Sequence, residues 1–174
     1  MKIAVIGAHG TGKTTLSKGI ADLFKFNHIP DVVADAFKLN FPINEDTPPE
    51  TQFWIISKQI ELERNTLSSW VMEKSLWDNI IYGEFSIKDK SVLKILRNIA
   101  EKNAKYDIVF YCPIEFPIPD DGLRSLNVEF QKTIDKEFRK YLKKQGIVFH
   151  ELKGNEQQRL KEAQSLIKKH KTKI

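Results

Sequence analysis

The sequence has little cysteine, no long apolar run and no internal repeat. Its one cysteine, Cys112, excludes an intramolecular disulfide and a zinc site built from clustered cysteines. No apolar stretch approaches the roughly 18 residues that a membrane span requires. The opening residues, Met1 to Ile6, are too few for a signal peptide, so we expect a cytoplasmic protein with no membrane partner.

The composition is typical of a soluble globular protein, with 41% hydrophobic and 29% charged residues. A length of 174 residues predicts a single compact domain over the whole chain. The net charge is +5, and much of the excess lies in a basic tail, 168–174, which is typical of a frayed, solvated end. A nucleic-acid partner would also account for this charge. The sequence does not indicate an oligomeric state.

Short apolar runs alternate along the chain with stretches in which apolar residues recur at helical spacing. The predicted strands cover residues 2–6, 28–33, 70–73, 107–112 and 147–152. Helices are predicted between them, and a proline-rich segment, 113–127, is a candidate lid. Strands that alternate with helices pair in parallel through right-handed crossovers. The predicted fold class is therefore α/β, a three-layer sandwich with about five parallel strands.

The turn after the first strand fits the phosphate-loop pattern G-x-x-x-x-G-K-[ST] at every fixed position. Its residues are Gly7, Ala8, His9, Gly10, Thr11, Gly12, Lys13 and Thr14, with Thr15 next. Glycines let successive N–H groups point at one phosphate, and the following helix adds a partial positive charge. The pattern predicts an ATP site in which Lys13 contacts the β- and γ-phosphates and Thr14 ligates Mg²⁺. His9 occupies an unrestricted position and is interpreted as part of the loop scaffold.

A carboxylate on the metal side is expected where a neighbouring strand ends, because ligands sit at the carboxyl edge of such sheets. The predicted strand 107–112 ends at Cys112 without an acid, whereas the strand 70–73 ends in Glu73. We therefore expect Glu73 to hold Mg²⁺, directly or through water. The alternative is a surface glutamate at a strand end.

Three short motifs resemble nucleoside and thymidylate-type kinases, and most closely the NadR-type (nicotinamide riboside kinase-like) AAA group. Glu73-Lys74-Ser75 resembles their acid-Arg-Ser motif, and Asp121-Gly122-Leu123-Arg124 resembles the Asp-Gly-x-Arg lid. Gly154-Asn155 with Arg159 resembles the late glycine turn and the arginine on the adenine side. The resemblance implies a P-loop kinase whose ATP contacts include Asn155 and Arg159. Lys74 departs from the usual arginine, and it keeps the charge but loses the bidentate fork.

The acceptor site is expected between the second strand and the lid. The resembling kinases place a carboxylate after the second strand to accept the acceptor hydroxyl's proton, and Asp35 stands there; a helix-capping aspartate is the alternative. Gln59 and Phe53 could bind a base, or belong to the core. Arg124 is expected to stabilise the transferred phosphoryl group from the lid, with an ordinary exposed arginine as the alternative.

These observations predict an ATP-dependent kinase that transfers the γ-phosphoryl group to a small nucleoside, nucleotide or related ribosyl acceptor. Two alternatives remain open: a polynucleotide 5′-kinase, and a nucleotide-dependent switch or partner-binding ATPase. Acids outnumber bases over residues 35–64, which disfavours a phosphate backbone as the acceptor. The sequence has no Asn-Lys-x-Asp motif for guanine, which disfavours a GTPase switch.

Overall fold

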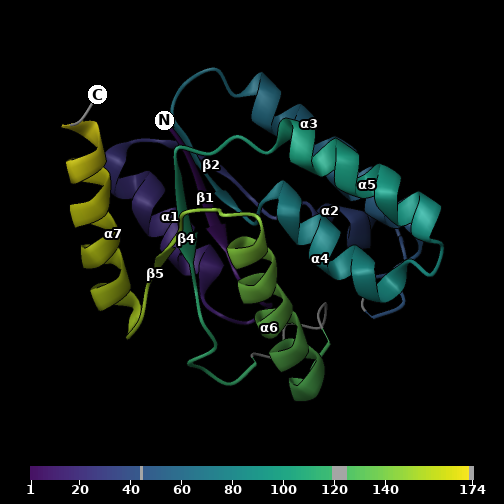
Figure 1. Ribbon diagram of the computed structural model, residues 1–174. Helices are drawn as coiled ribbons and strands as arrows, with labels where there is room; N and C mark the ends of the chain where they lie inside the picture. Colours follow the sequence, from purple (N-terminus) through teal and green to yellow (C-terminus); the bar gives the residue numbers. More distant parts are fainter. Residues whose placement is uncertain (44, 119–124, 173–174) are drawn as a thin grey trace.

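Five parallel strands form the centre of the molecule in the computed structural model, which describes residues 1–43, 45–118 and 125–172 (Figure 1). The sheet order is β2-β3-β1-β4-β5, and every pair of neighbours is parallel. The strands are β1 (Lys2–Ile6), β2 (Asn27–Ile29), β3 (Trp70–Glu73), β4 (Ile108–Tyr111) and β5 (His150–Glu151). The predicted fold class is confirmed.

Helices cover both faces of the sheet (Figure 1). One face carries α1 (Lys13–Phe24) and α7 (Glu156–Lys171). The other carries α3 (Pro49–Asn65), α4 (Leu76–Ser86), α5 (Lys90–Asn103) and α6 (Val128–Lys144). The short α2 (Val33–Lys38) packs against α3. The arrangement is a three-layer sandwich.

Strand β1 supplies both halves of the core because side chains alternate between the two faces of a strand. Ile3 and Val5 pack in the cluster beneath α1 and α7, whereas Ala4 and Ile6 pack on the side of α4 and α6. All four side chains are fully buried. Burial on both faces explains why the sequence of this strand is a continuous apolar run.

Several boundaries differ from the predicted ones. Strand β2 ends at Ile29, because Pro30 interrupts the run and α2 begins at Val33. Strand β5 is reduced to His150–Glu151. The tail that was predicted to fray is helical through Lys171, whose Nζ lies 5.1 and 4.9 Å from the ring centroids of Phe24 and Phe26.

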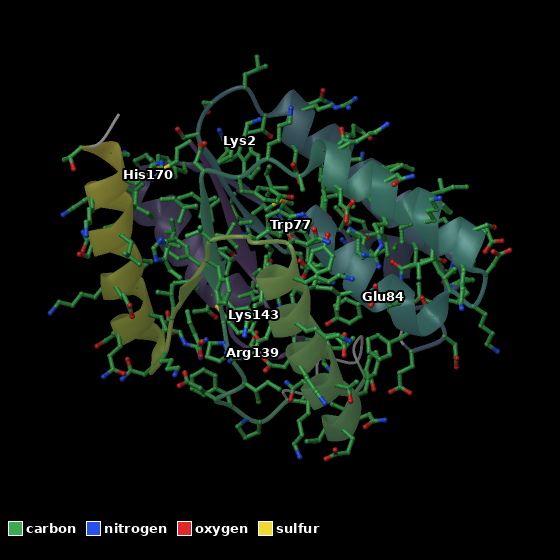
Figure 2. The ribbon with its side chains drawn as sticks, viewed as in Figure 1. Lys2, Trp77, Glu84, Arg139, Lys143 and His170 are labelled. Carbon is green, nitrogen blue, oxygen red and sulfur yellow. The ribbon has the colours of Figure 1, made fainter. Side chains whose placement is uncertain are left out.

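Helices α2 and α4 were not predicted. In α4, the side chains of Leu76, Trp77, Ile80 and Ile81 are all buried, so the helix lacks the polar face that marks an amphipathic pattern. Trp77 lies among the interior side chains at the centre of the view in Figure 2. Its ring makes an edge contact with Tyr106, at a centroid distance of 5.1 Å.

Within the part of the chain that the structure describes, no helix is long and apolar enough to cross a membrane.

Helix α6 should depend on Phe138 for its packing. The Phe138 side chain is fully buried, and its ring lies 6.3 Å from that of Tyr111 on β4. We expect Phe138→Ala to lower the free energy of unfolding by about 3–5 kcal/mol, measured by urea denaturation. The control, Leu67→Ala at a side chain that is 97% exposed, should change it by less than about 0.5 kcal/mol. A loss below about 1 kcal/mol for Phe138→Ala would contradict this packing.

Candidate functional site

The phosphate loop connects the end of β1 to the start of α1 in a conformation that requires glycine. A Cβ at Gly7 would lie 2.4 Å from the carbonyl oxygen of Cys112, and the φ of Gly7 is +136°. Gly12 precedes α1 with a φ of +82°. Among the described residues, α1 has no side-chain cap and no acid in its first turn. Its first N–H groups therefore remain available to an anion.

Lys13, Thr14 and Glu73 meet at the carboxyl edge of the sheet. The Lys13 side chain is buried, and its Nζ donates to the carbonyl oxygen of Ala8 (2.5 Å). The Thr14 hydroxyl donates to the Glu73 carboxylate. The sheet register explains this contact, because Glu73 of β3 pairs with Val5, two residues before the loop.

The chemistry of these side chains fits Mg²⁺, which prefers a few protein oxygens together with phosphate oxygens. The hydroxyl of Thr14 and the carboxylate of Glu73 are such oxygens, and they already face each other. Within the described residues, no group of three or more His, Cys, Asp or Glu side chains could hold a metal ion elsewhere.

Arg159 braces the phosphate loop from α7. Its guanidinium is buried and donates to the carbonyl oxygens of Thr11 (2.6 Å) and Gly154 (2.9 Å). It also forms an ion pair with Glu115 at 2.6 Å. The guanidinium carbon lies 4.9 Å from the centroid of the Phe116 ring. The Phe116 ring is therefore held close to Gly12, beside the start of α1. These contacts hold three loops together at one end of the sheet.

A cavity of about 70 Å³ opens beside His9 of the phosphate loop. Its described walls include Ile55 and Gln59 from α3 and Asn79 from α4. Ser125 closes one side, and its hydroxyl donates to Glu45 (2.7 Å). The cavity therefore lies between the phosphate loop, two helices of the second layer and the loop before α6.

His9 joins the phosphate loop to the walls of this cavity. Its backbone N–H donates to the hydroxyl of Tyr82 (3.2 Å), and its ring lies 5.9 Å from that of Phe130. The buried amide of Gln131 on α6 donates to the carbonyl oxygen of His9 (2.7 Å). The interpretation of His9 as scaffold agrees with these contacts.

Lys74 and Asp31 form a buried ion pair beside the cavity. The Nζ of Lys74 lies 3.1 Å from Oδ2 of Asp31, and Lys74 is one of the cavity-lining residues. Lys74 has a φ of +75°, a conformation that costs on the order of 1–3 kcal/mol in a residue with a side chain. Its ammonium also lies 5.4 Å from the ring centroid of Tyr82. Such strain is typical of functional positions.

Asp35 lies elsewhere. It is in α2, half exposed, with its carboxylate 3.1 Å from the Nζ of Lys38, and it is not among the cavity-lining residues. Asp31 is the carboxylate that follows β2 directly and lies beside the cavity. Asp31 was not predicted as a site residue because it lay inside the predicted strand 28–33. Pro30, which interrupts that strand, is the feature of the sequence that indicates a loop at Asp31.

Gln59 lines the cavity, and its neighbours determine the orientation of its amide. Its Oε1 accepts from Asn79 Nδ2 (3.2 Å), and its Nε2 donates to Glu63 Oε1 (3.4 Å). The Tyr106 hydroxyl donates to the same Glu63 oxygen (3.0 Å). Burial raises the pKa of Glu63 to about 7. Phe53 packs against the core rather than the described cavity wall.

The remaining predicted residues are less informative. The Asn155 side chain caps α7 by accepting from the N–H of Gln158 (3.0 Å). Thr15 is exposed in the first turn of α1. Arg124, together with the Asp-Gly-x-Arg part of the candidate lid, lies outside the described residues.

Several solved structures share this fold. The NadR protein in complex with NR matches with a TM-score of 0.75 and 18% identity, over 88% of this chain and 46% of that one. The chain therefore spans about half the length of NadR. Deoxyadenosine kinase from M. mycoides, with products dCMP and dCDP bound, has a TM-score of 0.75 and 15% identity, over 97% and 99% of the two chains. Thymidylate kinase from Ehrlichia chaffeensis has a TM-score of 0.68 and 15% identity, over 97% and 98%.

The chain therefore has the fold of these structures, with a phosphate loop after its first strand. No curated protein sequence matches the chain. An AAA domain family matches residues 2–159, which is most of the chain. The chain belongs to this AAA domain family.

The buried network behind Gln59 predicts a specific pH dependence of stability. Burial raises the pKa of Glu63 from its ordinary value of 4.5 to about 7, so between these values the folded chain binds more protons than the unfolded chain. The free energy of unfolding should therefore fall as pH rises through this window, by up to about 3 kcal/mol. Glu63→Gln keeps an acceptor for Tyr106 and should remove this contribution, measured by urea denaturation at pH 5 and pH 8.

The control is Glu61→Gln on the same helix, at a side chain that is 54% exposed. It should keep the wild-type pH dependence. An unchanged pH dependence in Glu63→Gln would show that Glu63 is ionised at neutral pH in the folded protein.

Proposed function

We propose that the protein is an ATP-dependent kinase that transfers the γ-phosphoryl group to a small nucleoside, nucleotide or related ribosyl acceptor. The observation that carries the proposal is the contact between the phosphate loop and the cavity, through His9. A donor site and an acceptor site are thereby adjacent. The bound ligands of two structural neighbours, NR in NadR and deoxynucleotide products in deoxyadenosine kinase, support this class of acceptor.

The phosphate loop supplies the donor side. The free N–H groups at the start of α1 and the ammonium of Lys13 would bind the β- and γ-phosphates. Thr14 and Glu73 would hold Mg²⁺, which neutralises charge on the phosphates when it is bound. The exposed ring of Phe116, held against Arg159, offers a flat face to an adenine next to Gly12, and Asn155 lies at the same end of α7. The predicted contact of Arg124 with the phosphoryl group stays part of the proposal.

The acceptor side centres on Asp31. Its carboxylate would accept the proton of the attacking hydroxyl, and Lys74 would orient the carboxylate and keep it charged. Lysine would serve here as a compact point charge that pairs with Asp31.

The lining of the cavity also bears on the charge of the acceptor. Among the described residues, its only charged side chains are Lys74 and Asp78. Such a lining suits one small molecule better than a polynucleotide end, which a basic groove would bind.

Lys13 provides the test of ATP use. Lys13→Ala should lower Mg²⁺-dependent ATP turnover roughly 100-fold or more, because a cation that stabilises transferred charge is lost. Lys18→Ala, at an exposed position of the same helix, is the matched control and should retain turnover. Turnover is measured by ADP formation, and folding by circular dichroism. Wild-type turnover in a folded Lys13→Ala protein would refute the donor site.

Asp31 and Asp35 form a matched pair for the acceptor side. We expect Asp31→Asn to lower kcat by about 100- to 10,000-fold, since general-base assistance would be lost. Asp35→Asn should leave kcat within about twofold, because this carboxylate forms only a surface ion pair. The measurement is steady-state kinetics with an acceptor that the wild-type protein phosphorylates. The reverse outcome, a large loss in Asp35→Asn alone, would assign the base to Asp35.

A further inference from the structure

Asp78 carries a buried carboxylate oxygen whose role the fold does not explain. The side chain is 2% exposed and lies in the wall of the cavity. Its Oδ2 accepts from both the N–H (2.7 Å) and the hydroxyl (2.8 Å) of Ser75, which caps the start of α4. Its Oδ1 has no hydrogen-bond partner among the described residues. A buried polar atom without a partner is rare and requires an explanation.

Helix capping accounts for only half of the carboxylate. The two bonds from Ser75 fix the orientation of Asp78 and leave Oδ1 as the oxygen without a hydrogen-bond partner among the described residues, in a side chain that lines the cavity. Burial raises the pKa of Asp78 to about 6, and a carboxylate with this pKa is largely ionised at neutral pH. An ionised carboxylate can only accept hydrogen bonds. A ligand atom next to Oδ1 therefore has to be a donor.

The charges near this oxygen do not replace such a donor. Lys74, the nearby cation in the same wall, is already ion-paired with Asp31 at 3.1 Å. Lys13 and Lys74 both act on the Asp78 carboxylate through their charge, and neither donates a hydrogen bond to Oδ1.

We propose that Asp78 recognises the acceptor by accepting a hydrogen bond from an N–H or O–H group of that molecule through Oδ1. The inference rests on the proposed function only in taking the cavity as the acceptor site. The hydrogen-bond donor on the acceptor molecule is either an amino group of a base or a hydroxyl of the ribose. Both can donate a hydrogen bond to Oδ1. Asp78 would then determine which acceptors bind, while Asp31 would serve the reaction.

The Asp78→Asn variant gives a sharp test because Ser75 determines how the amide must point. Ser75 donates two hydrogen bonds, so the amide oxygen should take the place of Oδ2 and the NH₂ group the place of Oδ1. The substitution would therefore replace a hydrogen-bond acceptor, Oδ1, with a hydrogen-bond donor, the NH₂ group. The variant should therefore bind a ligand with a donor about tenfold to a hundredfold more weakly, and should tolerate a ligand with an acceptor at the same place.

Binding is measured by calorimetry without ATP, which separates recognition from phosphoryl transfer. The probes are pairs that differ in one group: adenosine and inosine, cytidine and uridine, adenosine and its 2′-deoxy and 3′-deoxy forms. The wild type should prefer the donor-bearing member of one pair by at least tenfold, and Asp78→Asn should abolish or reverse that preference. Asp89→Asn is the control, since the Asp89 carboxylate caps the start of α5 at an exposed site, from the N-cap position. It should leave every preference unchanged.

The result that overturns the inference is a wild type without any tenfold preference, or an Asp78→Asn variant that keeps the preference or weakens all probes equally. A wild type without such a preference overturns the inference even if the variant does not fold. Phosphoryl transfer from ATP is assayed separately on the same probes. Selective binding without phosphoryl transfer would refute the proposed kinase and leave the role of Asp78 intact. Phosphoryl transfer together with an unchanged binding preference in the variant would refute the role of Asp78 and leave the proposed kinase intact.

Discussion

Strand β1 pairs with β3 on one side and with β4 on the other, and this central position brings the elements of the site together. The register places Glu73 beside Val5, so the end of β3 faces the turn that leads into α1. The same turn is closed against β4, where Gly7 leaves no room for a side chain beside Cys112. A shift of β3 by one residue would turn its side chains to the opposite faces of the sheet and separate Thr14 from Glu73.

The second layer turns this edge into a two-sided site. Helices α4 and α6 contact the phosphate loop through Tyr82 and Gln131, and both contacts are made to His9. Both helices are therefore hydrogen-bonded to the loop that would hold the phosphates. The strained backbone at Lys74 fits this picture, because it places an ammonium next to Asp31 where an extended strand end would direct it elsewhere. The cost of the strain is met by the surrounding packing.

The sequence predicted the sheet and the phosphate loop well because both depend on local patterns. Apolar runs of four to six residues and a glycine-rich turn with fixed spacing are sufficient for that. The sequence did not predict α4, because its buried surface carries no helical stripe. The predicted second strand was too long, because Pro30 ends the strand after Ile29. The ion pair of Asp31 with Lys74 and the isolated oxygen of Asp78 could not be predicted, because they arise from contacts between residues far apart in the chain or from local capping geometry. The general form of the donor site was thus readable from sequence, whereas the acceptor side required the structure.

The central claim is that one small acceptor receives the γ-phosphoryl group of ATP in the cavity beside the phosphate loop. The most direct measurement uses ATP labelled at the γ-phosphate with a panel of nucleosides, nucleotides, nicotinamide riboside and a 5′-hydroxyl oligonucleotide, at low and moderate salt. Label on a small ribosyl compound, with little change as salt rises, is the predicted result. Label mainly on the oligonucleotide that fades with salt, or label only in free phosphate with every acceptor, would contradict the account.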